Sequence, residues 1–287
     1  MKPPADLLEQ DAAAALGSAE FDEIRKLAHS TFGLSLRPGK EGLVSARLGR
    51  LVRRGGFRSF REYYRHVLTD RTGAALASMI DALATNHTSF LREPDHFAFL
   101  RETALKSLGT SQAVEVWCAA CSTGEEVWTL AMTLNDACPQ RRIPVTGSDI
   151  SNRALRAAEA AEYTIDQCRG IPASWLQRYF VPGQGPAKTY RVAPQLRGLA
   201  SFLRINLVEP LPFGRQFPLI FCRNAMIYFD RETQEQVVGR LAATLSPGGY
   251  LFVGHAESLN GIHHSLEYVR PAVYRKPGNQ EGRWIRS

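Results

Sequence analysis

The stretch Val114-Glu-Val-Trp-Cys-Ala-Ala-Cys-Ser-Thr-Gly124-Glu125-Glu126 decides the fold. Its apolar run predicts a strand, the small residues after it predict a tight turn, and a helix is expected from Glu125 to about Ala137. Small side chains let a ligand lie against the backbone at the carboxyl edge of a sheet, where doubly wound folds bind nucleotides. We therefore expect a cofactor at this turn.

The charge of the turn narrows the choice of cofactor. The GxGxxG fingerprint is missing here, and Glu125 and Glu126 would repel a pyrophosphate, which otherwise favours a helix N-terminus. This disfavours NAD and suits a cofactor with positive groups, such as the ammonium and sulfonium of S-adenosylmethionine. For one of the two glutamates, a simple interaction with the helix dipole is the alternative.

Outward from this stretch, the chain alternates between strand and helix. Further strands are expected at 143–147, 218–222, 250–254 and 268–275, and helices at 151–161 and 231–245. Such alternation predicts an α/β fold with a parallel, doubly wound sheet, closed by an antiparallel strand. Pro247-Gly248-Gly249 is interpreted as a turn. Gly/Pro turns and a strand-like run at 189–193 indicate a small β insertion over residues 183–205.

A second cofactor contact is predicted at Asp149, which lies 25 positions beyond Gly124 at the end of the next expected strand. An acid at that place can accept hydrogen bonds from both ribose hydroxyls, as in Rossmann domains. The alternative is that Asp149-Ile150-Ser151 is only a helix-capping turn. Beside the first motif, the cofactor interpretation is favoured.

Residues 19–84 predict an all-α N-terminal domain, preceded by a flexible Ala-rich tail at 1–18 and followed by the sheet domain at 85–287. Helices are expected from Phe21 to near Gly33, from Gly42 to Arg54, from a capping box at Ser59 and Glu62, and from Thr72 to Ala84.

This helical domain concentrates basic side chains in a chain whose net charge is +7 and whose pI is near 9.3. Arg47, Arg50 and Arg54 fall at i, i+3 and i+7 of one predicted helix, and Arg53 adds to the cluster. We interpret the group as a docking surface for an acidic partner. The alternative is an ordinary solvated helix face.

Composition excludes several classes of protein. The longest apolar stretches are broken within about a dozen residues, short of the roughly 20 that span a bilayer. The N-terminus has no apolar signal region, so a cytoplasmic protein is expected. Five scattered cysteines fit thiols in a reducing compartment. Cys118 and Cys121 have CxxC spacing, but no second Cys or His pair completes a zinc site, so no metal is expected.

The chain carries five distinctive segments: Thr85-Asn-His-Thr-Ser-Phe-Leu-Arg92-Glu-Pro-Asp-His-Phe97, Ala120-Cys-Ser-Thr-Gly-Glu-Glu126, Thr146-Gly-Ser-Asp149-Ile-Ser151, Phe221-Cys-Arg223-Asn224-Ala-Met-Ile-Tyr228-Phe-Asp230 and Ser246-Pro-Gly-Gly-Tyr-Leu-Phe-Val-Gly-His-Ala-Glu-Ser258. Together they resemble the CheR family of chemotaxis receptor methyltransferases, over roughly residues 20 to 276. The resemblance implies a helical N-terminal domain, a class I methyltransferase domain with a small β insertion, and methylation of receptor glutamates.

The resemblance also implies a set of cofactor residues: Asn86, Thr88, Arg92, Glu125, Asp149, Asn206, Leu207, Arg223 and Asn224. Arg92 would clamp the methionine carboxylate, and Glu125 would meet the ammonium. Tyr228 occupies the place of a family tyrosine near the transferred methyl, so Tyr228 and Arg92 are the candidate catalytic residues. The chain departs from the family at Val127-Trp128, where Pro-Tyr is usual; this puts local helix packing in doubt rather than cofactor binding.

Methyl transfer to a carboxylate needs no general base, because glutamate is ionised at pH 7 with a reference pKa of about 4.3. His87 and His255 are therefore interpreted as structural. The expected partners are S-adenosylmethionine, converted to S-adenosylhomocysteine, and the acidic helical bundle of a chemotaxis receptor, bound by a monomeric enzyme. Binding of a receptor's C-terminal tether peptide to the β insertion stays open, because many family members lack it.

Two rival functions are weighed against this one. A nucleic-acid methyltransferase would need base-stacking aromatics or a base-flipping pocket, and the arginine cluster includes no such group. A catalytically idle signalling adaptor would not need Arg92, Asp149, Asn224 and Tyr228, which are all present.

Overall fold

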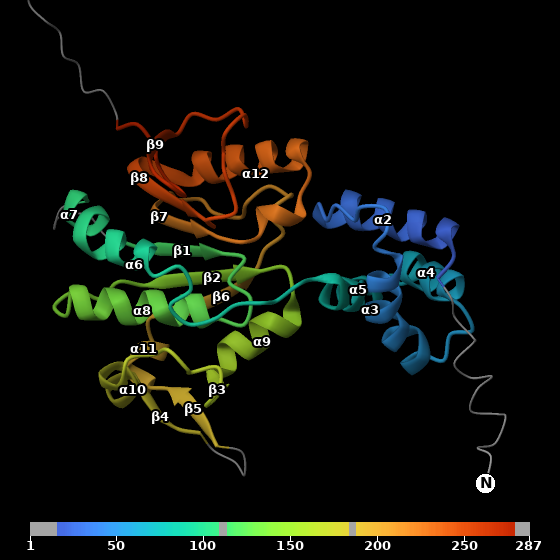
Figure 1. Ribbon diagram of the computed structural model, residues 1–287, viewed down its shortest axis with the longest axis horizontal. Coiled ribbons are helices and arrows are strands. Elements are labelled where there is room, and N and C mark those ends of the chain that lie inside the picture. The colour runs from blue at the N-terminus through green and yellow to red at the C-terminus, as the bar shows by residue number, and fades with distance from the viewer. Residues whose placement is uncertain (1–15, 109–113, 184–187, 279–287) are drawn as a thin grey trace, which may run out of the picture. The chain divides into compact units, whose positions relative to one another are not determined.

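The computed structural model describes residues 16–108, 114–183 and 188–278, and the chain divides into two compact units, Met1–Thr85 and Asn86–Ser287. Figure 1 shows the first unit as helices and the second as a sheet with helices around it. Of the expected tail, residues 1–15 lie outside the described residues, and Ser18 already opens the first helix. Within the described ranges, no helix is long and apolar enough to cross a bilayer.

The helices of the N-terminal unit are α2 (Ser18–Phe32), α3 (Glu41–Arg54), α4 (Phe60–Thr69) and α5 (Ala74–Leu83). Gly33 ends α2 in the left-handed region at φ 74°, as expected of a C-cap glycine. Ser59 caps α4 by accepting from the Glu62 N–H at 3.2 Å, and the Glu62 carboxylate accepts from the Arg58 N–H at 2.7 Å. The capping box is thus present, with its second bond displaced by one residue.

The second unit contains a seven-stranded sheet in the order β6-β2-β1-β7-β8-β10-β9. Its strands are β1 (Val116–Ala119), β2 (Val145–Asp149), β6 (Ala200–Arg204), β7 (Phe217–Cys222), β8 (Leu245–Val253), β9 (Glu267–Arg270) and β10 (Val273–Arg275). The first five strands in this order run parallel, and β10 is antiparallel to both of its neighbours. The expected doubly wound parallel sheet is confirmed.

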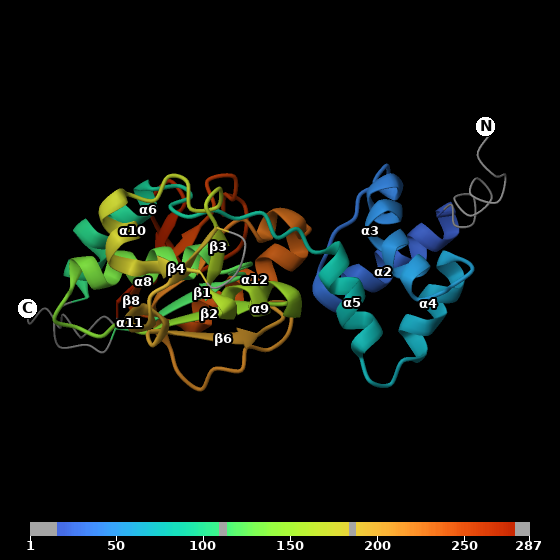
Figure 2. The ribbon, with the colours of Figure 1, turned by 90° about the horizontal axis from the view of Figure 1, so that it is seen from below.

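Helices cover both faces of this sheet. They are α6 (Asp95–Phe99), the π-helix η1 (Leu100–Ala104), α7 (Leu105–Ser107), α8 (Glu125–Ala137), α9 (Asn152–Ala160) and α12 (Arg231–Thr244). Successive residues of β1 point to opposite cores: Val116 and Cys118 pack in the core that contains α8, whereas Trp117 and Ala119 pack in the core that contains α12. Figures 1 and 2 both show α8 running alongside the sheet.

The small insertion is a three-stranded antiparallel sheet in the order β3-β5-β4, and it begins before the expected residue 183. β3 (Glu162–Thr164) and β4 (Phe180–Pro182) precede the Gly/Pro stretch, and β5 (Thr189–Val192) follows it. β6 was expected inside the insertion, but it pairs in parallel with β2 in the main sheet. Strands of three residues are too short to display alternation, so the sequence pattern did not mark where the insertion begins.

Two further expectations for the sheet are corrected. Pro247-Gly248-Gly249 lies within β8 rather than in a turn before it, because Gly248 at φ 75° and a register shift against β7 accommodate these residues as a bulge. The single closing strand expected at 268–275 is a hairpin, β9 and β10. Ala272 at φ 62° allows the chain to reverse between these two strands.

Candidate active site

Side chains from four strand ends gather at the carboxyl edge of the main sheet. The loops after β1, β2, β7 and β8 begin at Ala120, Ile150, Arg223 and Gly254. Because these strands are parallel, their carboxyl ends share one edge, the usual ligand edge of a doubly wound sheet. The segment before α6 reaches the same edge, since the Arg92 carbonyl accepts from an Arg223 terminal nitrogen at 2.6 Å.

The turn after β1 is built from left-handed residues. Ala120, Ser122 and Gly124 have φ values of 59°, 52° and 93°. At Gly124, a Cβ would lie 2.7 Å from the Ala158 Cβ of α9, so only glycine fits both the conformation and the space. The backbone of this turn is therefore held in one unusual shape against α9.

Glu125, the first residue of α8, is 2% exposed. Its carboxylate accepts from the Thr123 hydroxyl at 2.6 Å and from the Gln167 amide at 3.4 Å. Burial raises the pKa of Glu125, although the bonds to Thr123 and Gln167 act in the opposite direction. The turn is further tied to the β insertion by the Tyr163 hydroxyl, which donates to the Thr123 carbonyl at 2.8 Å.

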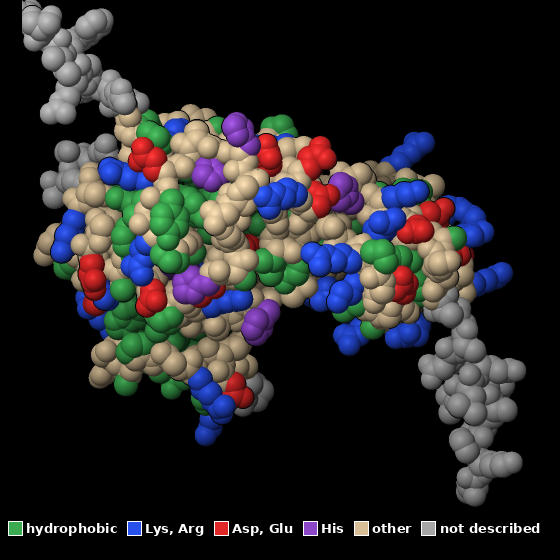
Figure 3. Space-filling view, turned by 45° about the horizontal axis from the view of Figure 1, so that its top comes forward, with side chains coloured by type: hydrophobic (Ala, Val, Ile, Leu, Met, Phe, Trp, Pro, Cys, Tyr) green, Lys and Arg blue, Asp and Glu red, His purple; other side chains and the backbone are tan. Residues whose placement is uncertain are grey.

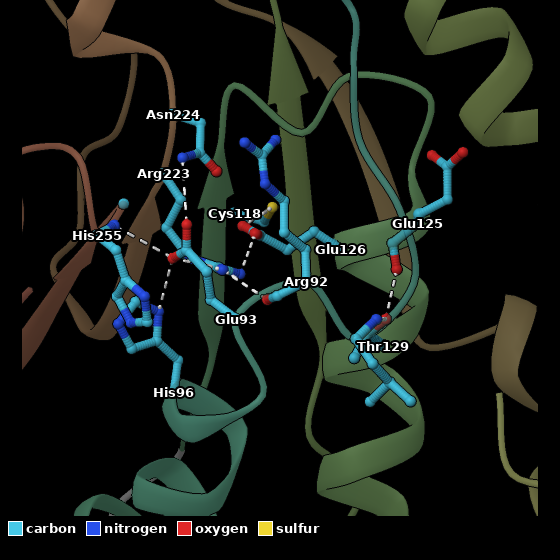
Figure 4. A network of polar contacts seen from close by, with 12 residues as sticks. Arg92, Glu93, His96, Cys118, Glu125, Glu126, Thr129, Arg223, Asn224 and His255 are labelled. Atoms are coloured by element: carbon cyan, nitrogen blue, oxygen red, sulfur yellow. Dashed lines mark hydrogen bonds and ion pairs between the residues drawn. The ribbon is translucent and has the colours of Figure 1, made fainter. Parts of the chain in front are cut away.

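Glu126 has a different role from its neighbour, because it pairs with Arg223. Figure 4 shows Arg223 within a network of polar contacts. Its guanidinium lies 2.6 Å from the Glu126 carboxylate and 2.8 Å from the Glu93 carboxylate. The Arg223 side chain is 1% exposed, and it lies over the Phe97 ring. Both of its terminal nitrogens bond within the protein. These contacts show that Arg223 supports the Arg92 segment, and the cofactor contact expected of Arg223 stays a prediction.

The Arg92 segment is strained. Leu91 and Glu93, on either side of Arg92, adopt φ values of 55° and 56°, which cost of order 1–3 kcal/mol each for non-glycine residues. Anchors on both sides hold this conformation: the Leu91 N–H donates to the Thr129 hydroxyl at 3.2 Å, and Arg223 binds the Arg92 carbonyl and the Glu93 carboxylate. The Arg92 guanidinium itself donates to the His87 carbonyl at 3.0 Å.

Asp149 ends β2 and is 7% exposed. One carboxylate oxygen accepts from the Ser122 N–H at 2.8 Å, and the other accepts from the Ser151 N–H at 2.9 Å. Ser151 in turn caps α9 by accepting from the Ala154 N–H at 3.1 Å. Capping therefore falls to Ser151, and Asp149 joins the loop after β1 to the loop after β2.

Asn224 and Tyr228 follow β7. Asn224 adopts φ 58°, and its amide donates to the second oxygen of Glu93 at 3.3 Å. Tyr228 ends the short 3-10 helix η2 (Met226–Tyr228) and is half-buried. The contacts of Glu93 thus bring Arg92, Arg223 and Asn224 together.

The remaining expected residues lie on neighbouring segments. Asn206 and Leu207 follow β6, and the Ile205 N–H before them donates to the Asp149 carbonyl at 3.1 Å. Asn206 is half-buried and donates to Glu209 at 2.8 Å, whereas Leu207 is buried in the core that contains α12. Asn86 and Thr88 are half-buried in the segment that leads to Arg92.

Two glutamates of this region were missed by the sequence reasoning, Glu93 and Glu257. Glu93 bonds Arg223 and Asn224, and the Glu257 carboxylate accepts from the Asn224 N–H at 2.7 Å. The sequence contained a signal for each of them. Glu93 directly follows Arg92. Glu257 lies four positions after the end of β8, and Asp149 likewise lies at the carboxyl end of a strand.

His96 and His255 lie beside Glu93 and form with it a group of potential metal ligands. His96 is 1% exposed, and burial together with the Arg223 charge lowers its pKa to about 3. The Arg223 guanidinium already binds the Glu93 oxygen that faces His96, and its charge would repel a cation there. These contacts favour a structural role for His255, whose backbone N–H donates to Glu93 at 3.3 Å.

The two cysteines of the CxxC spacing are buried free thiols. The Cys118 thiol donates to Glu126 at 3.2 Å. Burial raises the pKa of Cys118 and Cys121 well above the usual thiol value, which disfavours the thiolate that redox and metal chemistry need. Cys118 lies in β1, and Cys121 lies in the turn that follows it.

Comparison with known proteins identifies the family. Residues 19–84 match the CheR methyltransferase all-alpha domain, and residues 86–274 match the CheR methyltransferase SAM binding domain. The chain belongs to the CheR methyltransferase family. It is 37% identical to chemotaxis protein methyltransferase 2 of Pseudomonas aeruginosa, over 89% of this chain and 92% of that protein. It is 36% identical to the chemotaxis protein methyltransferase of Salmonella typhimurium, over 93% of each chain.

The side chains at the sheet edge fit the S-adenosylmethionine that this CheR domain binds. A buried carboxylate at Glu125 suits an ammonium group, a carboxylate at Asp149 suits ribose hydroxyls, and a guanidinium at Arg92 suits a carboxylate. Gly124 leaves the backbone of the turn without a side chain.

The unusual Val127-Trp128 pair is accommodated by the core of this CheR chain. Trp128 is 1% exposed and packs edge-on against Phe202, with ring centroids 5.7 Å apart. Val127 lies close to Gly147 of β2, where an added Cβ would be 2.8 Å from a Val127 methyl. α8 runs without interruption through both positions.

Proposed function

We propose that this protein transfers a methyl group from S-adenosylmethionine to glutamate side chains of chemotaxis receptors, giving glutamate methyl esters. One observation carries the proposal: a chain of the CheR family gathers Arg92, Glu125, Asp149 and Asn224 at one edge of its sheet. Each of the four is a hydrogen-bonding or charged group of the kind that this cofactor requires.

In the proposed mechanism, S-adenosylmethionine supplies the methyl group as the electrophile of an in-line displacement. The receptor carboxylate is already ionised at neutral pH and needs no base. The protein's task is therefore placement and exclusion of water. Arg92, Glu125, Asp149 and Asn224 would hold the cofactor, and Tyr228 would position the reacting groups.

Receptor docking is proposed for a basic face of α3. Arg50, Arg53 and Arg54 are exposed, and Figure 3 shows many Lys and Arg side chains on the N-terminal helices. Arg47 does not fit this role, because its guanidinium donates to the Leu83 carbonyl at the end of α5 and to the Thr85 hydroxyl. We therefore restrict the proposed docking surface to Arg50, Arg53 and Arg54.

The proposal also places the protein in the cytoplasm. All five cysteines are free, and four of them are buried. Thiols in a secreted protein would be exposed to oxidation, whereas the cytoplasm keeps them reduced.

The test of the function is transfer of labelled methyl from S-adenosylmethionine to receptor-containing membranes. We expect label in the receptor that mild base releases as methanol, because esters hydrolyse under conditions that leave N-methyl and C-methyl groups intact. Label that resists base would indicate another acceptor. Binding of the protein to receptor without any methyl transfer would instead indicate the idle adaptor, and label in added nucleic acid would indicate the nucleic-acid enzyme.

A further inference from the structure

Glu257, in the loop after β8, holds a carboxylate inside a ring of backbone donors. It is 6% exposed. One oxygen accepts from the N–H groups of Gly254 at 2.6 Å and Asn224 at 2.7 Å; the other accepts from Met226 at 2.7 Å and Ile227 at 3.2 Å. Hydrogen bonds to an ionised acceptor are roughly twice as strong as neutral ones. Burial raises the pKa of Glu257, while these N–H donors act in the opposite direction.

Three of these four donors belong to the segment that carries Asn224 and Tyr228. Asn224 is left-handed, a conformation that a non-glycine residue keeps only when its surroundings impose it. Its backbone N–H is fixed by Glu257, and its side chain is bound by Glu93. The two bonds to Met226 and Ile227 fix the start of η2, which ends at Tyr228.

The close approach of the two loops is also visible at Gly254. A Cβ there would lie 2.5 Å from the Asn224 amide nitrogen and 2.8 Å from a Glu257 oxygen. Glycine is therefore required where the loop after β8 meets the loop after β7. This packing restriction is independent of the hydrogen bonds and points to the same contact.

We propose that Glu257 is a positioning residue for methyl transfer: its carboxylate sets the backbone from Asn224 to Tyr228, and through it the placement of the Asn224 amide and the Tyr228 ring. The inference rests on the proposed function, because it takes Asn224 to act on the cofactor and Tyr228 to act on the reacting groups. Glu257 itself need not touch cofactor or receptor. The backbone donors can be matched only by an acceptor with two oxygens.

The test compares Glu257→Gln with Glu267→Gln, which makes the same change at an exposed position of β9. A glutamine amide would place its own N–H groups against backbone donors. We expect kcat for receptor methylation to fall on the order of 100-fold, as for loss of a positioning contact, while the Kd for S-adenosylhomocysteine rises less than about tenfold, because Asn224 is one of several proposed cofactor contacts. In amide NMR spectra, the N–H signals of Asn224, Met226 and Ile227 should move. Glu267→Gln should match the wild type.

Gly254→Ala supplies a second variant in case Glu257→Gln does not fold. It separates the two loops without a change of charge, and we again expect a much larger loss in kcat than in product affinity. A folded Glu257→Gln enzyme with wild-type kcat would overturn the inference. So would equal losses in kcat and product affinity, since those indicate a general structural role. Wild-type protein that methylates no receptor would contradict the proposed function instead, and the amide signals would still test the contact itself.

Discussion

Arg223 and Glu93, 130 positions apart in the sequence, form an ion pair at 2.8 Å in which the Arg223 side chain is 1% exposed and the Glu93 side chain 14% exposed. The same guanidinium binds Glu126 at 2.6 Å. One cation thus neutralises two poorly solvated carboxylates from different elements. The pair also explains how the strained backbone around Arg92 is kept in place, since the Arg92 carbonyl is bound by the same side chain.

Replacement of this guanidinium should destabilise the protein strongly. Arg223→Ala leaves Glu93 and Glu126 without their cation, and the loss of one partner from a buried pair costs about 3–5 kcal/mol. Urea unfolding of the isolated protein measures this loss in the free energy of unfolding. The control is Arg178→Ala, which removes an ion pair with Asp136. The side chains of Arg178 and Asp136 are 54% and 40% exposed, so a loss of stability of only about 0–1 kcal/mol is expected. Similar losses in the two variants would contradict the structural role of Arg223.

The main sheet could be predicted from the sequence because its strands and turns are marked by local patterns of residues. The run before Gly124 marks β1, and Asp149 ends β2 as expected. Topology then places both at one edge without any further information. The helices of the N-terminal unit were equally readable from their periodicity and caps, such as Gly33 and Ser59.

What the sequence did not predict are contacts between distant segments. Arg223 was expected at the cofactor from the CheR resemblance, and Arg47 was expected at a docking surface from its place in a basic helix. Each is engaged within its own unit, Arg223 by Glu93 and Glu126, and Arg47 by a helix-end carbonyl. Charge alone does not reveal a partner 130 positions away. The β insertion was misplaced for a related reason, since its three-residue strands are defined by their pairing with one another.

Asp149→Ala should weaken binding of the cofactor. Its carboxylate is the proposed acceptor for the ribose hydroxyls. Without it the hydroxyl donors of the bound ligand are unpaired, which weakens the free energy of binding by roughly 1 to 3 kcal/mol. Calorimetry with S-adenosylhomocysteine measures the affinity. Because Asp149 also binds the Ser122 N–H, Asp149→Asn is a useful second variant that keeps one carbonyl acceptor and should lose less. The control is Asp166→Ala, which removes an exposed carboxylate. Unchanged affinity in Asp149→Ala would contradict the assignment of Asp149 as the ribose acceptor.

The affinity for the cofactor should fall in mild acid. Burial raises the pKa of Glu125 above its ordinary value, and an ammonium group binds only the ionised carboxylate. The affinity should therefore be highest above the raised pKa and should be lost as the pH falls through it. This loss should occur at a higher pH than for an ordinary glutamate, whose pKa is about 4.3. Calorimetry with S-adenosylhomocysteine across that range gives the profile. Glu125→Gln should bind more weakly and without this step; if it keeps the step, another group titrates.

Tyr228→Phe should lower turnover more than it lowers cofactor affinity. Tyr228 ends η2 and is proposed to position the reacting groups through its hydroxyl. Loss of one positioning contact can cost on the order of 100-fold in rate. kcat for receptor methylation and the Kd for S-adenosylhomocysteine are compared, with Tyr268→Phe at an exposed position of β9 as the control. Equal losses in both quantities would make Tyr228 a binding or packing residue.

Charge reversal on α3 should weaken the enzyme's hold on its receptor. Arg50 and Arg54 lie four positions apart and are exposed, so they share one face of the helix. Arg50→Glu with Arg54→Glu should raise KM for receptor on the order of tenfold, about 1.4 kcal/mol, and leave the Kd for S-adenosylhomocysteine unchanged. Wild-type activity should also fall with added salt, because contacts between exposed charges are screened beyond about 8 to 10 Å at physiological ionic strength.

The matched control reverses Lys26 and Arg156, two exposed residues outside α3, and changes the net charge by the same amount. If KM rises equally in the control, the effect belongs to the overall charge of the protein and not to a docking face. If the α3 double variant keeps wild-type kinetics at low salt, its arginines form an ordinary solvated surface. The receptor contact would then be sought first on the β3-β5-β4 insertion, whose outer strands β3 and β4 each pair with β5 within that sheet.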